Sequence, residues 1–156
     1  MTMEYSLLTC AIARSTKVLG DSWSLLIMRD MLFHKKFKFK EFKASKEKIA
    51  SNILTNRLKS LLEMGLIEKL DPTGSKKSTT YIATPKGMES LPIICQMYLF
   101  SIDSIDESLL NDVQKNVKKQ IKNNTPLFQQ TKISEYISFV EELRENLSLS
   151  KLALKK

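Results

Sequence analysis

The chain has 156 residues, 42% of them hydrophobic and 27% charged, which suits one compact domain with an appended element. Four glycines and four prolines are too few for a β-sandwich or barrel, and two cysteines are too few for a disulfide scaffold or a four-ligand zinc site. These exclusions leave a mainly α-helical protein. Its net charge of +8 favours a polyanionic partner.

The N-terminal residues lack the basic patch and apolar core of a secretory signal. The most apolar stretch, residues 91–100, is interrupted by Pro92 and Gln96, so we expect no transmembrane helix and no membrane partner. Together with the low cysteine count, this predicts a protein of the reducing cytoplasm.

Two helices are predicted before residue 35. The first covers residues 9–20 and ends at Gly20, because glycine accepts the left-handed conformation that follows many helix ends. Asp21 then provides a carboxylate for the free N–H groups of a second helix. That helix is apolar nearly all round, which predicts a central core element.

A basic stretch follows, with seven lysines and two glutamates in residues 35–48 and a short helix near 39–44. Residues 1–100 carry +7 of the net charge of +8. A basic face binds polyanions through counterion release. The alternative is an ordinary surface of solvated lysines.

An amphipathic helix is predicted over residues 51–64, with Leu54, Leu58 and Leu61 on its apolar face. The opposite face carries a polar stripe of Asn52, Thr55, Asn56 and Lys59. Asparagine pairs with the edge of adenine, threonine contacts base edges or the thymine methyl, and lysine reaches guanine or a phosphate. The alternative is the solvated face that every surface helix has.

The spacing then changes to two short extended runs, residues 66–70 and 78–83, joined by a turn that contains Pro72 and Gly74. This predicts a β-hairpin with a basic tip. Thr84 and Pro85 begin a long helix to about residue 106, with an irregularity at Pro92. Helical stripes at 109–121 and 133–147 follow, separated by a break at 123–126.

The predicted fold is therefore mainly α with a small β-hairpin wing: a winged helix-turn-helix plus a C-terminal helical extension. We expect residues 1–106 to form a winged helix-turn-helix DNA-binding domain, and residues 107–156 to form the extension. As a hypothesis, the stripe of Ile133, Tyr136, Ile137 and Val140 docks on the long helix.

Several ordered segments resemble the HxlR-type winged-helix transcriptional regulators. They are CAIAR at 10–14, LGDSWSLLIMRD at 19–30, FKEF at 39–42, IASNILTNRL at 49–58, EMGLI at 63–67 and YIATPKG at 81–87. The resemblance implies a bacterial, homodimeric regulator that binds double-stranded DNA. In the family the first helix and the long helix after the wing pair two subunits.

The resemblance places the helix at 51–64 in the major groove and the wing at 71–78 on the flanking backbone or minor groove. An inverted-repeat operator is expected, with half-sites about one helical turn apart. The predicted DNA-binding residues are Ser51, Asn52, Thr55, Asn56, Lys59, Lys40, Lys76 and Lys77. The family commonly has Ser and Pro at the start of this helix, where this chain has Ala50 and Ser51.

Cys10 matches the position at which several family members sense oxidants or electrophiles, which suggests an oxidant or small-molecule effector. A thiol near a helix N-terminus gains thiolate character. The alternative is an inert structural cysteine. Cys95, within the long apolar helix, is expected to serve packing. Arg57 either meets a phosphate or pairs with Asp21 or Asp30.

Two other classes of function are alternatives to sequence-specific DNA binding. A winged helix could instead serve as a protein- or RNA-interaction module without sequence-specific DNA binding. An enzyme is not expected, because one histidine allows no Ser–His–Asp set and no glycine-rich phosphate loop occurs. No cofactor and no metal site are expected.

Overall fold

The computed structural model describes residues 9–71 and 79–153. Its elements in chain order are α2 (Ala11–Leu19), α3 (Ser24–His34), α4 (Phe39–Lys43), α5 (Ser51–Glu63), β1 (Ile67–Lys69), β2 (Tyr81–Ala83), α6 (Pro85–Met88), α7 (Ser90–Ile102), the 3-10 turn η2 (Glu107–Leu109), α8 (Asp112–Asn123) and α9 (Thr125–Ala153). The predicted fold class, mainly helical with one β-hairpin, is confirmed.

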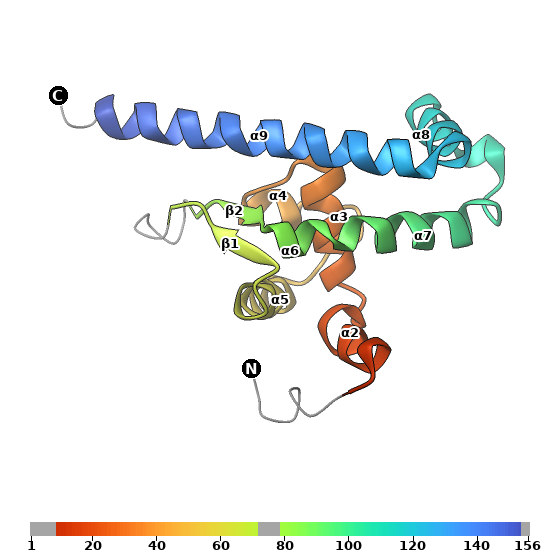
Figure 1. Ribbon diagram of the computed structural model, residues 1–156, viewed down its shortest axis with the longest axis horizontal. Coiled ribbons are helices and arrows are strands. Elements are labelled where there is room, and N and C mark those ends of the chain that lie inside the picture. The colour runs from red at the N-terminus through yellow and green to blue at the C-terminus, as the bar shows by residue number, and fades with distance from the viewer. Residues whose placement is uncertain (1–8, 72–78, 154–156) are drawn as a thin grey trace.

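Helix α3 lies at the centre of the molecule, with α9 above it, α7 beside it and α2 and α5 on the lower side (Figure 1). Its side chains at Ile27, Met28, Met31 and Leu32 are buried. The prediction of a central core helix is confirmed, and it follows from a sequence with almost no polar face.

The helix ends follow the sequence with one correction. Asp21 accepts hydrogen bonds from the backbone N–H groups of Trp23 and Ser24, each at 2.9 Å, as predicted. Gly20 does follow the last residue of α2, but its φ is −78°, so a left-handed conformation was the wrong reason. Gly65 has a φ of +69°, and here glycine is needed to end α5 and turn the chain into β1.

The hairpin pairs β1 with β2 in antiparallel register, with Ile67 opposite Ala83 and Lys69 opposite Tyr81. The backbone N–H of Tyr81 also donates to the Phe37 carbonyl at 2.9 Å, so the segment before α4 borders the other edge of β2. The tip at 72–78, which carries Lys76 and Lys77, lies outside the described residues.

The single long helix predicted from Pro85 to about 106 is wrong in detail. Two helices occur instead, because the chain breaks at Glu89 rather than at Pro92. Thr84 caps α6 as expected, accepting from the Gly87 N–H at 3.1 Å. Pro92 lies in the first turn of α7, where a missing N–H leaves no helical hydrogen bond unmade.

Helix α8 contacts the first part of α9 near one end of α7 and is seen nearly end-on where α9 runs across the view; α9 then crosses the molecule along α3 (Figure 1). Two tilted ring pairs attach α9 to the earlier chain: Phe33 with Phe128, at 5.9 Å between centroids, and Phe37 with Phe139, at 5.7 Å. Ile133, Tyr136 and Val140 face the core, whereas Ile137 is 43% exposed. The docking hypothesis for this stripe is thus correct except at Ile137, and its partners include α3 as well as α7.

Tyr136 joins α9 to the hairpin. Its side chain is 1% exposed, and its hydroxyl oxygen accepts a hydrogen bond from the Ala83 backbone N–H at 2.8 Å. Burial raises the pKa of this phenol to about 12, against the opposing effect of the Ala83 N–H. This bond satisfies the buried Ala83 N–H of β2, which is bonded to Tyr136 on α9 rather than to β1.

Two tyrosines offer a matched test of this hydrogen bond. Tyr98 also has a buried hydroxyl, but it has no hydrogen-bond partner in the described part of the chain. We expect Tyr136→Phe to lower the free energy of unfolding by about 2 kcal/mol, because it orphans the Ala83 N–H. Tyr98→Phe removes an unsatisfied group and should leave stability unchanged or raise it by about 1 kcal/mol. Urea unfolding of both variants measures this, and equal destabilisation would contradict the role given to Tyr136.

Candidate nucleic-acid interface

Helix α5 is fixed to the body by its apolar face. Leu54, Leu58 and Leu61 are each no more than 2% exposed and lie in the main core. Arg57, at the edge of that face, forms an ion pair with Asp21 at 3.4 Å, which favours the structural alternative for this residue. In Figure 1 the helix is seen end-on along the lower side of the molecule. Because the apolar face of α5 is fixed in the core, the opposite face of the helix must point outward.

The polar stripe lies on that outward face. Ser51, Asn52, Thr55, Asn56 and Lys59 are all exposed. The Thr55 hydroxyl donates to the Ser51 carbonyl at 2.9 Å, so its proton is engaged while its methyl group and lone pairs remain available. Lys59 has only a 3.8 Å ion pair with Glu63, exposed on both sides and easily given up.

Helix α5 begins at Ser51, as predicted, and it begins without a capping side chain. Ala50 occupies the N-cap position, so no side chain caps the helix, and the first backbone hydrogen bond runs from the Leu54 N–H to the Ala50 carbonyl. The N–H groups of the first turn face outward with the positive end of the helix dipole, an arrangement suited to a phosphate.

A buried ionic cluster orients the segment that leads into α5. Asp30, 2% exposed in the second half of α3, accepts hydrogen bonds from Arg29 at 2.7 Å and Lys36 at 2.7 Å, and also from Ser45. Arg29 in turn binds Glu47 at 2.7 Å. The cluster therefore holds the connector of residues 44–50 against α3, and α5 begins where that connector ends.

The electrostatics of the cluster favour its charged form. Burial alone would raise the pKa of Asp30, but hydrogen bonds from Lys36, Ser45 and Arg29 together hold it below its ordinary value. The hydrogen bond from Arg29 lowers the pKa of Glu47 to about 2. Both carboxylates are therefore ionised at neutral pH, and the cluster is paired rather than titrating.

The seven lysines of residues 35–48 divide into two groups. Lys36 binds Asp30, Lys38 donates to the Thr80 hydroxyl at 2.6 Å, Lys43 donates to the Ile49 carbonyl at 2.6 Å, and Lys35 lies over the Phe139 ring at 5.9 Å. The side chains of the other three are exposed and make no hydrogen bond or ion pair in the described ranges: Lys40, Lys46 and Lys48. The basic stretch is thus partly structural, although only Lys36 has its charge paired with a carboxylate.

A sequence-family comparison decides the class of this fold. The HxlR-like helix-turn-helix family model matches residues 18–108, more than half of the chain. The chain belongs to the HxlR-like helix-turn-helix family. The match includes α3, α5 and the hairpin, and it ends before α8.

Solved structures agree with the family assignment. The candidate transcription factor PA1607 is 29% identical, with a TM-score of 0.59 over 70% of this chain and 75% of its own. A candidate MarR-family regulator from Porphyromonas gingivalis W83 is 27% identical, with a TM-score of 0.53 over 62% of this chain and 94% of its own. No curated protein matches at a significant level. The family and these neighbours support a DNA-binding transcriptional regulator, a class generally distinct from enzymes.

The two cysteines of this HxlR-like chain have different surroundings. Cys10 is exposed at the N-cap position of α2, without a side-chain capping bond. Cys95 is fully buried on α7, as expected for a packing residue, and burial raises the pKa of its thiol. A sensing role for Cys10 stays a prediction.

Metal sites and membrane spans were the other features for which the described residues offer a direct comparison. Among residues 9–71 and 79–153, no three His, Cys, Asp or Glu side chains gather closely enough to hold a metal ion. Within those same ranges no helix is both long and apolar enough to cross a membrane.

The ionic cluster at Asp30 can be tested by mutation. Asp30→Asn should lower the free energy of unfolding by about 3 kcal/mol at pH 7, because it leaves Arg29 and Lys36 half-buried without their shared partner. Since folding holds the pKa of Asp30 below its ordinary value of 3.8, the stabilisation is present above that value and is lost as pH falls further. Denaturation between pH 7 and pH 2 should show the two proteins converging in acid. A constant difference across that range would contradict the ionic explanation.

Proposed function

We propose that this chain regulates transcription as a homodimer that binds an inverted-repeat operator, with α5 of each subunit in the major groove. The observation that carries the proposal is the exposed polar stripe on α5, opposite a face that is fixed in the core. A helix fits one major groove, and its N-terminal residues meet the base edges.

Reading and anchoring fall to different residues in this proposal. Asn52 and Asn56 form bidentate pairs with adenine, and Thr55 offers its methyl group to thymine. The uncapped N–H groups at Ser51 and the ammonium group of Lys40 bind backbone phosphates, which carry no sequence information. Lys59 reaches a guanine or a phosphate after leaving Glu63.

The wing completes the footprint. Lys76 and Lys77, outside the described residues, are proposed to bind the flanking backbone or minor groove. The hairpin that carries them is fixed to the body at its base, where β2 is bonded to Phe37 and to Tyr136. The spacing between α5 and the hairpin base is therefore rigid.

The division between reading and anchoring is testable once a site is selected from random duplex DNA with the purified protein. Asn56→Ala should reduce discrimination at one base pair of each half-site by about 1–3 kcal/mol, because a bidentate amide–base pair is lost. Lys40→Ala should weaken all sequences alike and reduce the salt dependence of binding. Fluorescence anisotropy against the selected site and its point variants measures both.

Asn146→Ala is the matched control, since Asn146 is an exposed asparagine on α9, far from α5 in the chain. It should bind every sequence as the unaltered protein does. If Asn56→Ala and Lys40→Ala lose the same affinity with unchanged base preference, the assignment of roles is wrong. If no sequence is enriched at all, an interaction module for protein or RNA becomes the better description.

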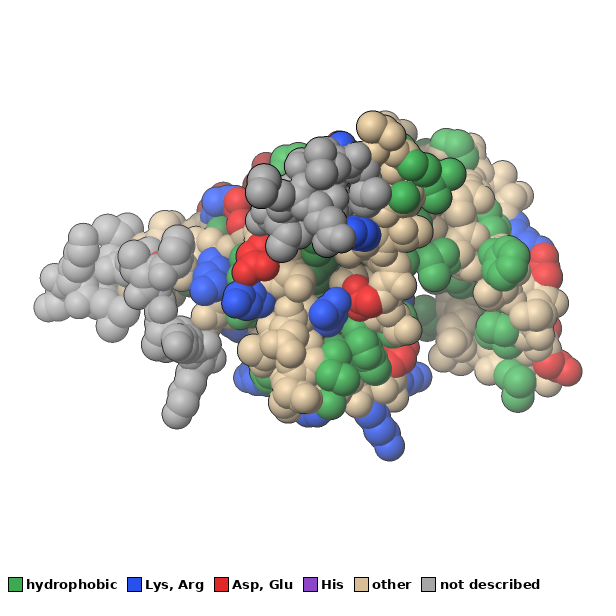
Figure 2. Space-filling model, turned by 90° about the horizontal axis from the view of Figure 1, so that it is seen from below, with side chains coloured by type: hydrophobic (Ala, Val, Ile, Leu, Met, Phe, Trp, Pro, Cys, Tyr) green, Lys and Arg blue, Asp and Glu red, His purple; other side chains and the backbone are tan. Residues whose placement is uncertain are grey.

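An exposed apolar face supports the homodimer. On α7 the side chains of Ile93, Met97 and Phe100 are 42%, 52% and 91% exposed, and on α2 Ile12 is 76% exposed. Viewed from below, hydrophobic side chains gather on the right-hand part of the surface, while most Lys and Arg side chains lie at the centre and left (Figure 2). A face of this kind, beside a polar DNA-facing surface, fits a second copy of the chain.

Substitution on α7 tests the homodimer. Phe100→Ser should convert a dimer into a monomer at micromolar concentration. The substitution removes a large, nearly fully exposed apolar side chain that the second subunit would cover in the proposed dimer. Ile137→Ser on α9 removes an apolar side chain that is 43% exposed on another element and should leave the dimer intact. Sedimentation velocity distinguishes the two, and a dimer that survives Phe100→Ser would exclude this face.

Cys10 belongs to the same proposal as a candidate oxidant-responsive residue. It lies two residues before Ile12, at the beginning of the helix that contributes to the apolar face. Modification of its exposed thiol would add a polar group beside that face and weaken pairing. Repeating the DNA selection under reducing and oxidising conditions tests this role.

A further inference from the structure

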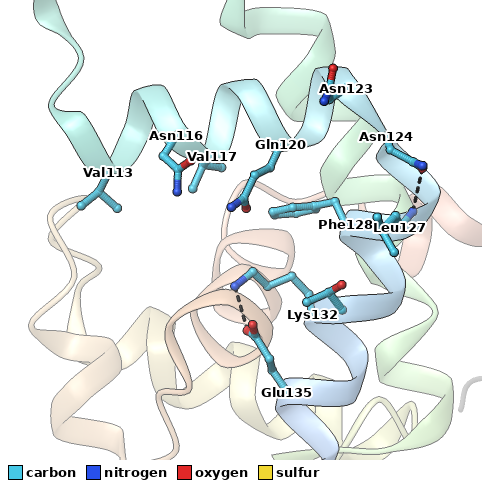
Figure 3. Close-up of a pocket in the computed structure, with 11 residues that line it drawn as sticks. Val113, Asn116, Val117, Gln120, Asn123, Asn124, Leu127, Phe128, Lys132 and Glu135 are labelled. Carbon is cyan, nitrogen blue, oxygen red and sulfur yellow. Dashed lines mark hydrogen bonds and ion pairs between the residues drawn. The ribbon is translucent and has the colours of Figure 1, made fainter.

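A groove lies between α8 and α9, outside the part of the chain that matches the family. Its volume is about 540 Å³, within the range of small-molecule sites. The two helices meet at their closed end, where Ile121 and Phe128 are buried, and diverge toward Val113, which is 73% exposed. Figure 3 shows the groove with α8 above and α9 to the right.

The groove is lined by amides where a helix pair ordinarily packs apolar side chains. Asn116, Gln120 and Asn123 recur at helical spacing along one side of α8. Within the described ranges, the side chains of these three residues make no hydrogen bond. Only Asn124, which accepts from the Leu127 N–H at 3.0 Å, is used to cap α9. In Figure 3 Asn116 and Gln120 extend from α8 into the groove, whereas Asn123 points away from it, so two unbonded amides offer donors and acceptors there.

The opposite wall supplies an apolar surface and a neutral ion pair. In Figure 3 Gln120 extends from α8 toward α9 beside the Phe128 ring, and the Lys132 ammonium group is directed at Glu135. The Lys132 ammonium group binds the Glu135 carboxylate at 2.8 Å. Of the side chains that line this groove, these are the charged ones, so each charge already has its counterion.

We propose that this groove binds a small, uncharged aromatic molecule that carries an amide or lactam edge. The carbonyl and N–H of such an edge complement a side-chain amide at two points, and its ring lies against Val117 and the small exposed part of Phe128. An anionic ligand finds no unpaired cation in the groove, and a cationic ligand finds no unpaired carboxylate. Seven of the eleven lining residues are polar, which does not suit the apolar stripe of a docking helix.

The occupied groove would bear directly on the hairpin. Phe128 and Tyr136 lie eight residues apart on the same face of α9, and Tyr136 holds the Ala83 N–H of β2. A molecule seated against Phe128 therefore contacts the helix that supports the wing.

Isothermal titration calorimetry of the full chain without DNA tests the site, using 2-naphthamide and 2-naphthoate as probes. The two have nearly the same shape and differ in charge. We expect 2-naphthamide to bind at least tenfold more tightly than 2-naphthoate, because the groove has paired charges and free amides. Equal or tighter binding of 2-naphthoate, or no binding of 2-naphthamide, would overturn the proposal.

Gln120→Leu should weaken 2-naphthamide binding by about tenfold, since it removes one amide partner without reducing the side chain's volume. Asn116→Leu serves as a second variant with the same expected direction. Gln130→Leu is the matched control, because Gln130 is exposed on α9 but does not line the groove. The affinity of this variant for 2-naphthamide should change less than about twofold. If Gln120→Leu and Asn116→Leu both bind as tightly as the control, the amides do not form the site. Because no DNA is present, this result is independent of the proposed operator binding.

Discussion

The burial of α3 on all sides determines how the rest of the chain is arranged. A helix with apolar residues around its whole circumference must be covered by several neighbours. Helices α2, α5 and α7 cover part of it, and α9 covers the remainder through the contact of Phe33 with Phe128. The C-terminal extension is therefore part of the core. An extension that only tethered a partner would leave this aromatic surface in water.

Asp30 is the exception in that apolar helix, and its buried charge explains the orientation of α5. A buried carboxylate contributes little net stability, but it tolerates few arrangements of its partners. Lys36 and Ser45 reach it from either side of α4, and Arg29 extends the contact to Glu47. These bonds hold the chain against α3 both before and after α4. Helix α5 follows the connector, and its first turn has no capping side chain of its own.

The sequence was sufficient wherever a local pattern decides the outcome. The leucines of α5 predict which face is buried, so the exposure of Asn52 and Asn56 follows from periodicity alone. The sequence was insufficient where the position of a side chain depends on a residue far away in the chain. Lys38 is bonded to Thr80, and Lys35 lies over Phe139, partners that no local pattern reveals. The break at Glu89 is similar, because Pro92 is equally compatible with the interior of a kinked helix and with the first turn of a new one.

This internal use of lysines changes the balance between affinity and specificity at the interface. Phosphate contacts supply most of the sequence-independent affinity of a DNA-binding protein. Lys36 is paired with Asp30, whereas Lys40, Lys46 and Lys48 keep free ammonium groups in the described ranges. In the proposed binding mode, fewer free ammonium groups would leave a larger share of the binding free energy to base contacts. The amides of α5 would then determine which sites are occupied, and pairing of two subunits would double the number of base contacts.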